Sequence, residues 1–195
     1  EDLDREREVA SATRHIIATL AAFGLHPDAP VVRQSTRTGL YRAALQRLAD
    51  AGHAYRCWCS RSDLEPLGGI HPPTCVARPA PREPAWRLRV GEACLGFDDR
   101  ICGPYRQQLA SAVGDFVIWR ADGACAYQLA VVVDDAAQGI TGGVRGADLL
   151  DSTPRQLLLQ RLLGLPQPSY AHLPLVLDAQ GRKLSKHEDA RPVEA

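Results

Sequence analysis

The chain has 195 residues, 45% of them hydrophobic and 24% charged, which excludes an intrinsically disordered chain and predicts one folded domain or most of one. Lysine plus arginine and aspartate plus glutamate number 23 each, so the formal net charge of zero exerts no long-range attraction on nucleic acid or a membrane. No run of about 18 apolar residues is present and five of the first twenty residues are acidic. Neither a membrane span nor a signal peptide is predicted, and the cytoplasm is the expected location.

The first fifty residues have the periodicity of two helices. A helix over residues 5–23, capped by Gly24, is predicted from apolar residues spaced three and four apart, namely Val9, Ala12, Ile16, Leu20 and Phe23. A second helix follows from a similar stripe of Leu40, Ala44, Leu48 and Ala51. Ser35 or Thr36 is the expected N-cap of this helix, and Gly52 is its expected terminator.

The middle of the chain predicts strands. Trp86, Leu88 and Val90 alternate with Arg87 and Arg89, which is the two-residue period of a half-buried strand. Another strand is predicted at residues 116–119, closed by a turn at residues 122–123. The run from residue 127 to 135 fits a strand by its three valines and a helix by its apolar face, and we favour the helix.

The last predicted helix has the clearest start signal. Thr153 can act as its N-cap, Pro154 suits the first helical position, and Gln156 completes a capping box. The helix is expected to run to about Leu163 and to end at Gly164. Since helices and strands interleave along the chain, an α/β layered fold is predicted.

A loop with metal-ligand spacing lies between the first two helices and the first strand. Residues 57–84 have no apolar periodicity and are rich in glycine and proline, so metal binding or packing on neighbours must offset the entropy of ordering them. Within nineteen residues this loop offers four ligands of the kind that zinc prefers: Cys57, Cys59, His71 and Cys75. Because the four ligands leave no open position, we expect a structural rather than a catalytic Zn²⁺. His71 has a simpler alternative, since a lone histidine is more often a surface or hydrogen-bonded residue.

Two other interpretations of the cysteines stay open. A disulfide is one, although disulfides are rare in the cytoplasm and Cys57 and Cys59 lie too close together in sequence for an easy bridge. Buried free cysteines are the other, and this is the interpretation we adopt for Cys94, Cys102 and Cys125, which lack partner spacing.

Two lysines and a hydroxyl gather in a loop near the carboxyl end. Lys183, Ser185 and Lys186 follow an apolar run at residues 172–177, and such a loop can offer mobile positive charge to a triphosphate. A solvated basic loop is the simpler interpretation of so short a motif. The wider context favours the triphosphate, because the segment that ends in this motif reads HLPLVLDAQGRKLSK.

That segment resembles the second signature, of KMSKS type, of class I aminoacyl-tRNA synthetases in their glutamate and glutamine branch. Residues 115–118, 126–135, 139–141 and 144–148 resemble the same branch. The zinc loop and the forms AYQLAVVVDD and VRGADLL resemble, within it, the glutamyl-queuosine tRNA(Asp) synthetase family, which often has tyrosine where this chain has His71. The resemblance implies a partial class I Rossmann-like catalytic domain over residues 1–195, with an inserted zinc-binding subdomain at about 57–84 and a KMSKS-like loop at 183–187.

The resemblance also implies an activity. The family activates glutamate with ATP and Mg²⁺ and transfers it to queuosine in the anticodon of tRNA(Asp). Carried over by position, Glu1, Tyr127 and Arg145 are expected to contact the substrate glutamate, and an arginine fork suits a carboxylate. Lys186 is expected to act in catalysis on ATP, with Lys183 and Ser185 shaping the ATP-binding loop. A monomer is expected.

Departures from the family pattern leave alternatives open. The chain contains no methionine and begins downstream of the family's HIGH-like segment, so we expect a fragment that is inactive alone. Residues 127 and 145 read without the resemblance would be a core aromatic and a surface ion pair. The alternatives for function are a fragment of an ordinary glutamyl-tRNA synthetase, which charges tRNA(Glu), and a non-catalytic, zinc-stabilised RNA-binding module.

Overall fold

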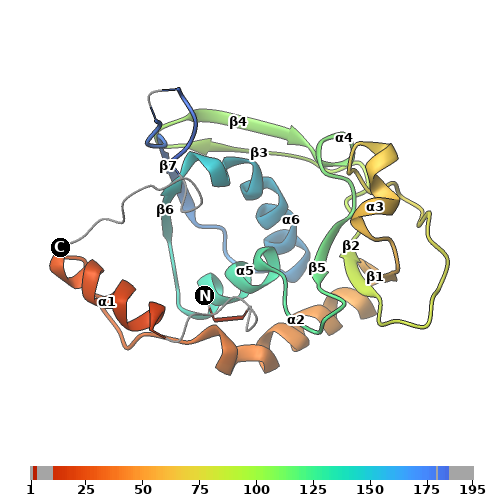
Figure 1. Ribbon diagram of the computed structural model, residues 1–195, viewed down its shortest axis with the longest axis horizontal. Coiled ribbons are helices and arrows are strands. Elements are labelled where there is room, and N and C mark those ends of the chain that lie inside the picture. The colour runs from red at the N-terminus through yellow and green to blue at the C-terminus, as the bar shows by residue number, and fades with distance from the viewer. Residues whose placement is uncertain (1, 4–10, 179, 185–195) are drawn as a thin grey trace. The chain divides into compact units, whose positions relative to one another are not determined.

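Figure 1 presents the computed structural model of the chain, which describes residues 2–3, 11–178 and 180–184. The chain divides into two units. One consists of Glu1–Arg37 with Leu175–Ala195, and the other of Thr38–Pro174. Each unit has its own secondary structure and its own contacts.

The described part of the first unit contains one helix and a short 3₁₀ turn. Helix α1 spans Ala12–Ala22, which confirms the predicted helix within the described residues, since residues 4–10 lie outside them. It ends as expected at Gly24, whose φ of 76° is in the left-handed region that glycine adopts without steric cost. The 3₁₀ turn η1 spans Gln34–Arg37. The hydroxyl of Ser35 in this turn donates to the Asp2 carboxylate over 2.5 Å.

The second unit begins with α2, which spans Thr38–Asp50. The prediction that Ser35 or Thr36 is its N-cap is wrong, because both residues lie in the preceding 3₁₀ turn. The buried face of α2 is also shifted from the predicted stripe: Leu40 is 48% exposed, whereas Tyr41 is fully buried. The predicted end is correct, since Gly52 follows with a φ of 75°.

A three-stranded antiparallel sheet holds the metal-ligand loop. Its strands are β1 (Ala54–Cys57), β2 (Ala85–Leu88) and β5 (Phe116–Trp119), in the order β1-β2-β5. The strands predicted near 86–90 and at 116–119 are confirmed, and β1 was not predicted. Tyr55 and Arg87 are register partners on one face of this sheet. Arg87 is buried rather than exposed, so the predicted alternation of buried and exposed side chains in β2 is wrong there.

The remaining strands form a hairpin and a parallel pair. The hairpin joins β3 (Cys94–Asp99) to β4 (Gly103–Gln108), and the parallel pair consists of β6 (Gly142–Gly146) and β7 (Ser169–Leu173). The 3₁₀ segment η3 (Ala147–Ser152) and helix α6 (Thr153–Leu163) connect β6 to β7. A strand, a helix and a parallel strand form the repeating unit of α/β folds, so the α/β prediction is confirmed in this part.

Helix α5 (Tyr127–Ala137) confirms the helical interpretation of the ambiguous valine-rich run. It packs against α2 and α6, and α6 also packs against β3; Figure 1 shows α5 and α6 between α2 and the hairpin of β3 and β4. Short helical turns complete the unit: α3 (Arg61–Leu64), η2 (Glu65–Leu67) and α4 (Leu109–Ala112). No helix among the described residues has the length and apolar character needed to cross a membrane.

Candidate functional site

The four predicted metal ligands lie together. The ligand atoms of Cys57, Cys59, His71 and Cys75 are all within 4.8 Å of one another, and His71 Nε2 is 3.2 Å from Cys57 Sγ. A tetrahedral zinc ion with bonds of about 2.0–2.3 Å keeps its ligand atoms about 3.5 Å apart. Strand β1 carries Cys57, while the capped turn at Ser60 and the loop beyond it return the chain to His71 and Cys75. The donors and their spacing therefore fit zinc with little movement.

The pKa shifts of Cys57 and His71 suit a cation, whereas the Cys75 thiol must lose its proton to bind one. Burial raises the pKa of Cys57, but hydrogen bonds from the Cys59 backbone N–H, the neighbouring thiols and Arg87 outweigh it and leave the pKa below its usual value. Burial and the adjacent Cys57 thiolate raise the pKa of Cys75 to about 12. Burial, and then the charge of Arg87, lower the pKa of His71, which favours the neutral imidazole that metals bind.

The prediction that Cys94, Cys102 and Cys125 are buried free cysteines is only partly correct. The three remaining cysteines are free, as expected, but only Cys125 is buried. Cys94 is exposed because the alternation of β3 points it away from Leu95 and Phe97, which are buried. Cys102 is exposed because it lies in the hairpin turn between β3 and β4.

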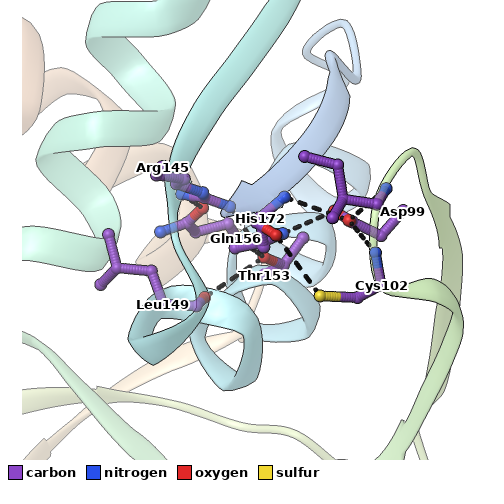
Figure 2. A network of polar contacts seen from close by, with 8 residues as sticks. Asp99, Cys102, Arg145, Leu149, Thr153, Gln156 and His172 are labelled. Carbon is purple, nitrogen blue, oxygen red and sulfur yellow. Dashed lines mark hydrogen bonds and ion pairs between the residues drawn. The ribbon is translucent and has the colours of Figure 1, made fainter. Parts of the chain in front are cut away.

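Arg145 lies at the centre of a polar network, shown in Figure 2. Its two terminal nitrogens donate to Gln156 Oε1 and Thr153 Oγ1, each over 2.7 Å. The guanidinium carbon lies 4.7 Å from the centre of the Tyr170 ring. Both of these acceptors are neutral, so they fix the orientation of the guanidinium without neutralising its charge. Asp135 is electrostatically coupled to it: burial raises the pKa of Asp135, and the charge of Arg145 partly opposes that shift.

The buried side chain of His172 contacts this network through Thr153. His172 Nδ1 lies 2.6 Å from Asp99 Oδ2, and both side chains are fully buried. On its other side His172 Nε2 lies 3.3 Å from Thr153 Oγ1, which accepts from Arg145. Burial raises the pKa of Asp99, but hydrogen bonds from the Cys102 backbone N–H and from His172 outweigh it and hold the pKa well below its usual range. Asp99 is therefore ionised at neutral pH.

The network explains why the capping prediction for α6 is wrong. Ser152 precedes the helix as its N-cap, and no side chain makes a cap hydrogen bond there. Thr153 and Gln156 are instead engaged by Arg145. Pro154 stands in the first turn, and Gly164 ends the helix with a φ of 63°, as predicted.

Tyr127 is the first residue of α5 and is 36% exposed. The next residue, Gln128, accepts from Gln156 Nε2 over 2.9 Å and donates to Ser152 Oγ over 3.1 Å. The start of α5 is thereby tied to the residues that hold Arg145. The structure thus links the elements that carry the two predicted glutamate contacts, Tyr127 and Arg145.

The described part of the lysine loop begins with a tight turn in the first unit. Asp178 accepts from the backbone N–H and the Nε of Arg182, and Leu177 and Lys183 form an antiparallel bridge. The backbone hydrogen bond from Arg182 is the main cause of a lowered pKa at Asp178. Glu1, Ser185 and Lys186 lie outside the described residues.

Asp99, His172 and Gln156 were missed as candidates for the site. Asp99 and His172 are 73 residues apart, so no local spacing connects them. The signal in the sequence was His172 itself, because a histidine that is buried within an apolar run needs a hydrogen-bond partner.

Comparison with known proteins defines the class. The model of the family described as tRNA synthetases class I (E and Q), catalytic domain, matches residues 1–83 and 77–194. A glutamate tRNA ligase from Elizabethkingia meningosepticum, solved with its amino acid, has the same fold, with a TM-score of 0.79 and 24% identity over 95% of this chain and 44% of that one. The chain belongs to the class I (E and Q) tRNA synthetase family and has its mixed α/β catalytic-domain fold.

Within that family the similar relatives carry a more specific name. The chain is 60% identical to the glutamyl-Q tRNA(Asp) synthetase of Xanthomonas axonopodis pv. citri over 97% of its own length and 63% of the relative's. It is 53% identical to that of Ectopseudomonas mendocina over 100% of its own length and 67% of the relative's. The chain thus groups with the glutamyl-Q tRNA(Asp) synthetases and spans about two thirds of the length of these relatives.

Proposed function

We propose that the protein containing this chain activates glutamate with ATP and transfers it to queuosine in the anticodon of tRNA(Asp). The observation that carries the proposal is the fixed guanidinium of Arg145 in a chain 52–60% identical to glutamyl-Q tRNA(Asp) synthetases. The family match over residues 1–83 and 77–194 makes a non-catalytic RNA-binding module the less supported alternative. The relatives' names favour tRNA(Asp) over the tRNA(Glu) of an ordinary glutamyl enzyme.

Arg145 and Tyr127 supply the chemistry for a glutamate ligand. A planar guanidinium held by neutral acceptors keeps its charge for an anion and loses little conformational entropy when it binds one. The Tyr127 hydroxyl, at the half-exposed start of α5, can hydrogen-bond the same substrate. Glu1 completes the proposed set of glutamate contacts.

Adenylate formation is an in-line attack of the glutamate carboxylate on the α-phosphorus of ATP, with pyrophosphate as the leaving group. Negative charge grows on the phosphoryl oxygens, and Mg²⁺ bound with the ATP neutralises part of it. Lys186 is the proposed catalytic cation. Lys183 and Ser185 are proposed to shape the ATP-binding loop. The hydrogen bonds of Asp178 with Arg182 fix the turn at which this loop begins.

Replacing Lys186 with alanine is expected to lower glutamate-dependent exchange of pyrophosphate into ATP by roughly a hundredfold, because a positioned charge acts on the transition state. The exchange rate of the full-length protein at saturating ATP measures this. Arg120→Ala is the matched control, because it removes an exposed cation that is paired with Asp122 and lies outside the lysine loop, and it should retain most of the activity. Equal and small effects from both substitutions contradict the role of Lys186.

The four-residue cluster is proposed to hold one structural zinc ion per chain. We expect Cys59→Ser and Cys75→Ser to abolish zinc retention after dialysis, because each removes one of four ligands. Cys94→Ser, which changes an exposed cysteine outside the cluster, is the control and should retain the metal. Metal analysis of the purified variants tests this, and full zinc content in both ligand variants disproves the site.

Loss of the metal should also loosen residues 57–84, because metal binding and local folding are coupled. Amide hydrogen exchange should rise in that loop after chelation and change little in α5 and α6, which hold no proposed ligand. Exchange that rises evenly along the whole chain contradicts a local role for the metal.

A further inference from the structure

We propose that Tyr55 and Asp115 act together as a positioning pair that fixes His71 as a metal ligand through its Nε2 atom. The proposal rests on the zinc site proposed above and concerns two residues that are not ligands. Both side chains come from the three-stranded sheet, Tyr55 from β1 and Asp115 from the position before β5. They therefore connect a rigid element to a loop that has few apolar contacts of its own.

The hydrogen bonds around His71 determine which ring nitrogen carries the proton. The Tyr55 hydroxyl donates to Asp115 Oδ2 over 2.7 Å, so its oxygen presents a lone pair to His71 Nδ1 at 3.3 Å. The carbonyl oxygen of Pro72, which can only accept, lies 2.6 Å from the same Nδ1. Nδ1 must therefore carry the proton and donate to both oxygens.

The proton on Nδ1 leaves Nε2 with a free lone pair. That atom points toward the thiols and lies 3.2 Å from Cys57 Sγ. Metal-binding histidines usually donate their other ring N–H to a carboxylate or carbonyl, which fixes the ring and raises its basicity. In this protein the Pro72 carbonyl and the Tyr55 hydroxyl fill that position, and Asp115 acts on the histidine through Tyr55.

Asp115 is well placed to hold the pair rigid. It is buried, its Oδ1 accepts from the Val90 backbone N–H over 2.9 Å, and its own N–H donates to the His71 carbonyl oxygen over 3.2 Å. Its carbonyl oxygen accepts from Arg87 over 2.8 Å, which accounts for the burial of that arginine. Each polar group of Asp115 thus contacts the ligand loop or the sheet beneath it.

The backbone next to Asp115 allows this close approach. Gly114 pairs with His71 in an isolated parallel bridge and has a φ of 67°. A Cβ atom at this position would lie 2.2 Å from the His71 carbonyl oxygen, which no side chain permits. Glycine is therefore required where the ligand loop meets the sheet.

The test measures zinc affinity in the full chain by competition with a chromophoric chelator, together with the visible absorption of the cobalt form. Tyr55→Phe removes only the hydroxyl and is expected to weaken zinc binding about 10- to 100-fold and to shift the cobalt bands. Asp115→Asn should have a similar effect, and the double variant should be no weaker than the poorer single variant. Tyr105→Phe is the matched control, because it removes a tyrosine–aspartate hydrogen bond, to Asp151, outside the cluster.

A second background separates positioning of the histidine from general support of the loop. In a His71→Cys protein the fourth ligand is a thiolate with no Nδ1 atom, so Tyr55→Phe is expected to leave zinc affinity unchanged. An equal loss of affinity in both backgrounds overturns the proposal, because Tyr55 would then support only the fold. Unchanged affinity in the single variant overturns it as well, and a parent chain that binds no zinc overturns the metal site itself.

Discussion

Arg145→Ala in the full-length protein is expected to raise the glutamate concentration needed for half-maximal adenylate formation by at least about thirtyfold, with a smaller change in kcat. Removing one partner of a desolvated charged hydrogen bond costs about 2–5 kcal/mol, which corresponds to that factor or more. The carboxylate contact exists in the ground state and in the transition state alike, so its loss acts mainly on substrate affinity. Pyrophosphate exchange over a range of glutamate concentrations gives both constants.

Two further variants make that result specific. Arg47→Ala removes another arginine that contacts α6, through the Leu163 carbonyl oxygen over 2.8 Å, and should leave the glutamate requirement unchanged. Arg145→Lys keeps the charge but cannot hold Gln156 and Thr153 together, so only part of the affinity should return. A glutamate requirement that is unaffected by Arg145→Ala rules out its proposed role.

The elements predicted correctly are those with strong local signals. The end of α6 was fixed by Gly164, whereas the run that forms α5 was ambiguous between a strand and a helix, and the helix was correctly favoured. The cluster of Cys57, Cys59, His71 and Cys75 could be predicted from spacing because all four ligands lie within one loop. Short sequence separation makes such an assembly visible without knowledge of the fold.

The features that were missed depend on distant parts of the chain. Strand β6 has the sequence GGVRG, which has neither alternation nor strand propensity and is a strand only because β7 pairs with it. Arg87 was assigned to solvent because the period of β2 does not reveal that the ligand loop and Asp115 cover that face. The pair of Asp99 and His172 requires the β3 hairpin to pack beside β7, which no local pattern encodes.

Thr153 and Gln156 show how one motif can serve two structures. Their spacing is that of a capping box, yet both side chains accept from Arg145, and Thr153 also contacts the buried His172. Local sequence rules describe the preference of an isolated helix end, and a half-buried arginine that needs acceptors outweighs that preference. The departure from the local rule coincides with the proposed glutamate site.

Discrimination between acceptor RNAs is the largest effect that the proposed function predicts. The formal net charge of zero gives this chain little long-range attraction for RNA, so selection must come from a short-range pocket that reads an unstacked anticodon base. A pocket built to hydrogen-bond the hydroxyls of queuosine would keep unpaired polar groups when guanosine takes its place. Such a pocket can reject the wrong substrate by about 10⁴-fold.

Transfer of radiolabelled glutamate by the full-length protein tests directly whether queuosine in tRNA(Asp) is the acceptor. Three RNAs are compared at equal concentration: tRNA(Asp) carrying queuosine, unmodified tRNA(Asp) and tRNA(Glu). We expect rapid transfer to the first RNA and transfer to the other two that is slower by about 10⁴-fold. Efficient charging of tRNA(Glu), or no preference between the two forms of tRNA(Asp), contradicts it.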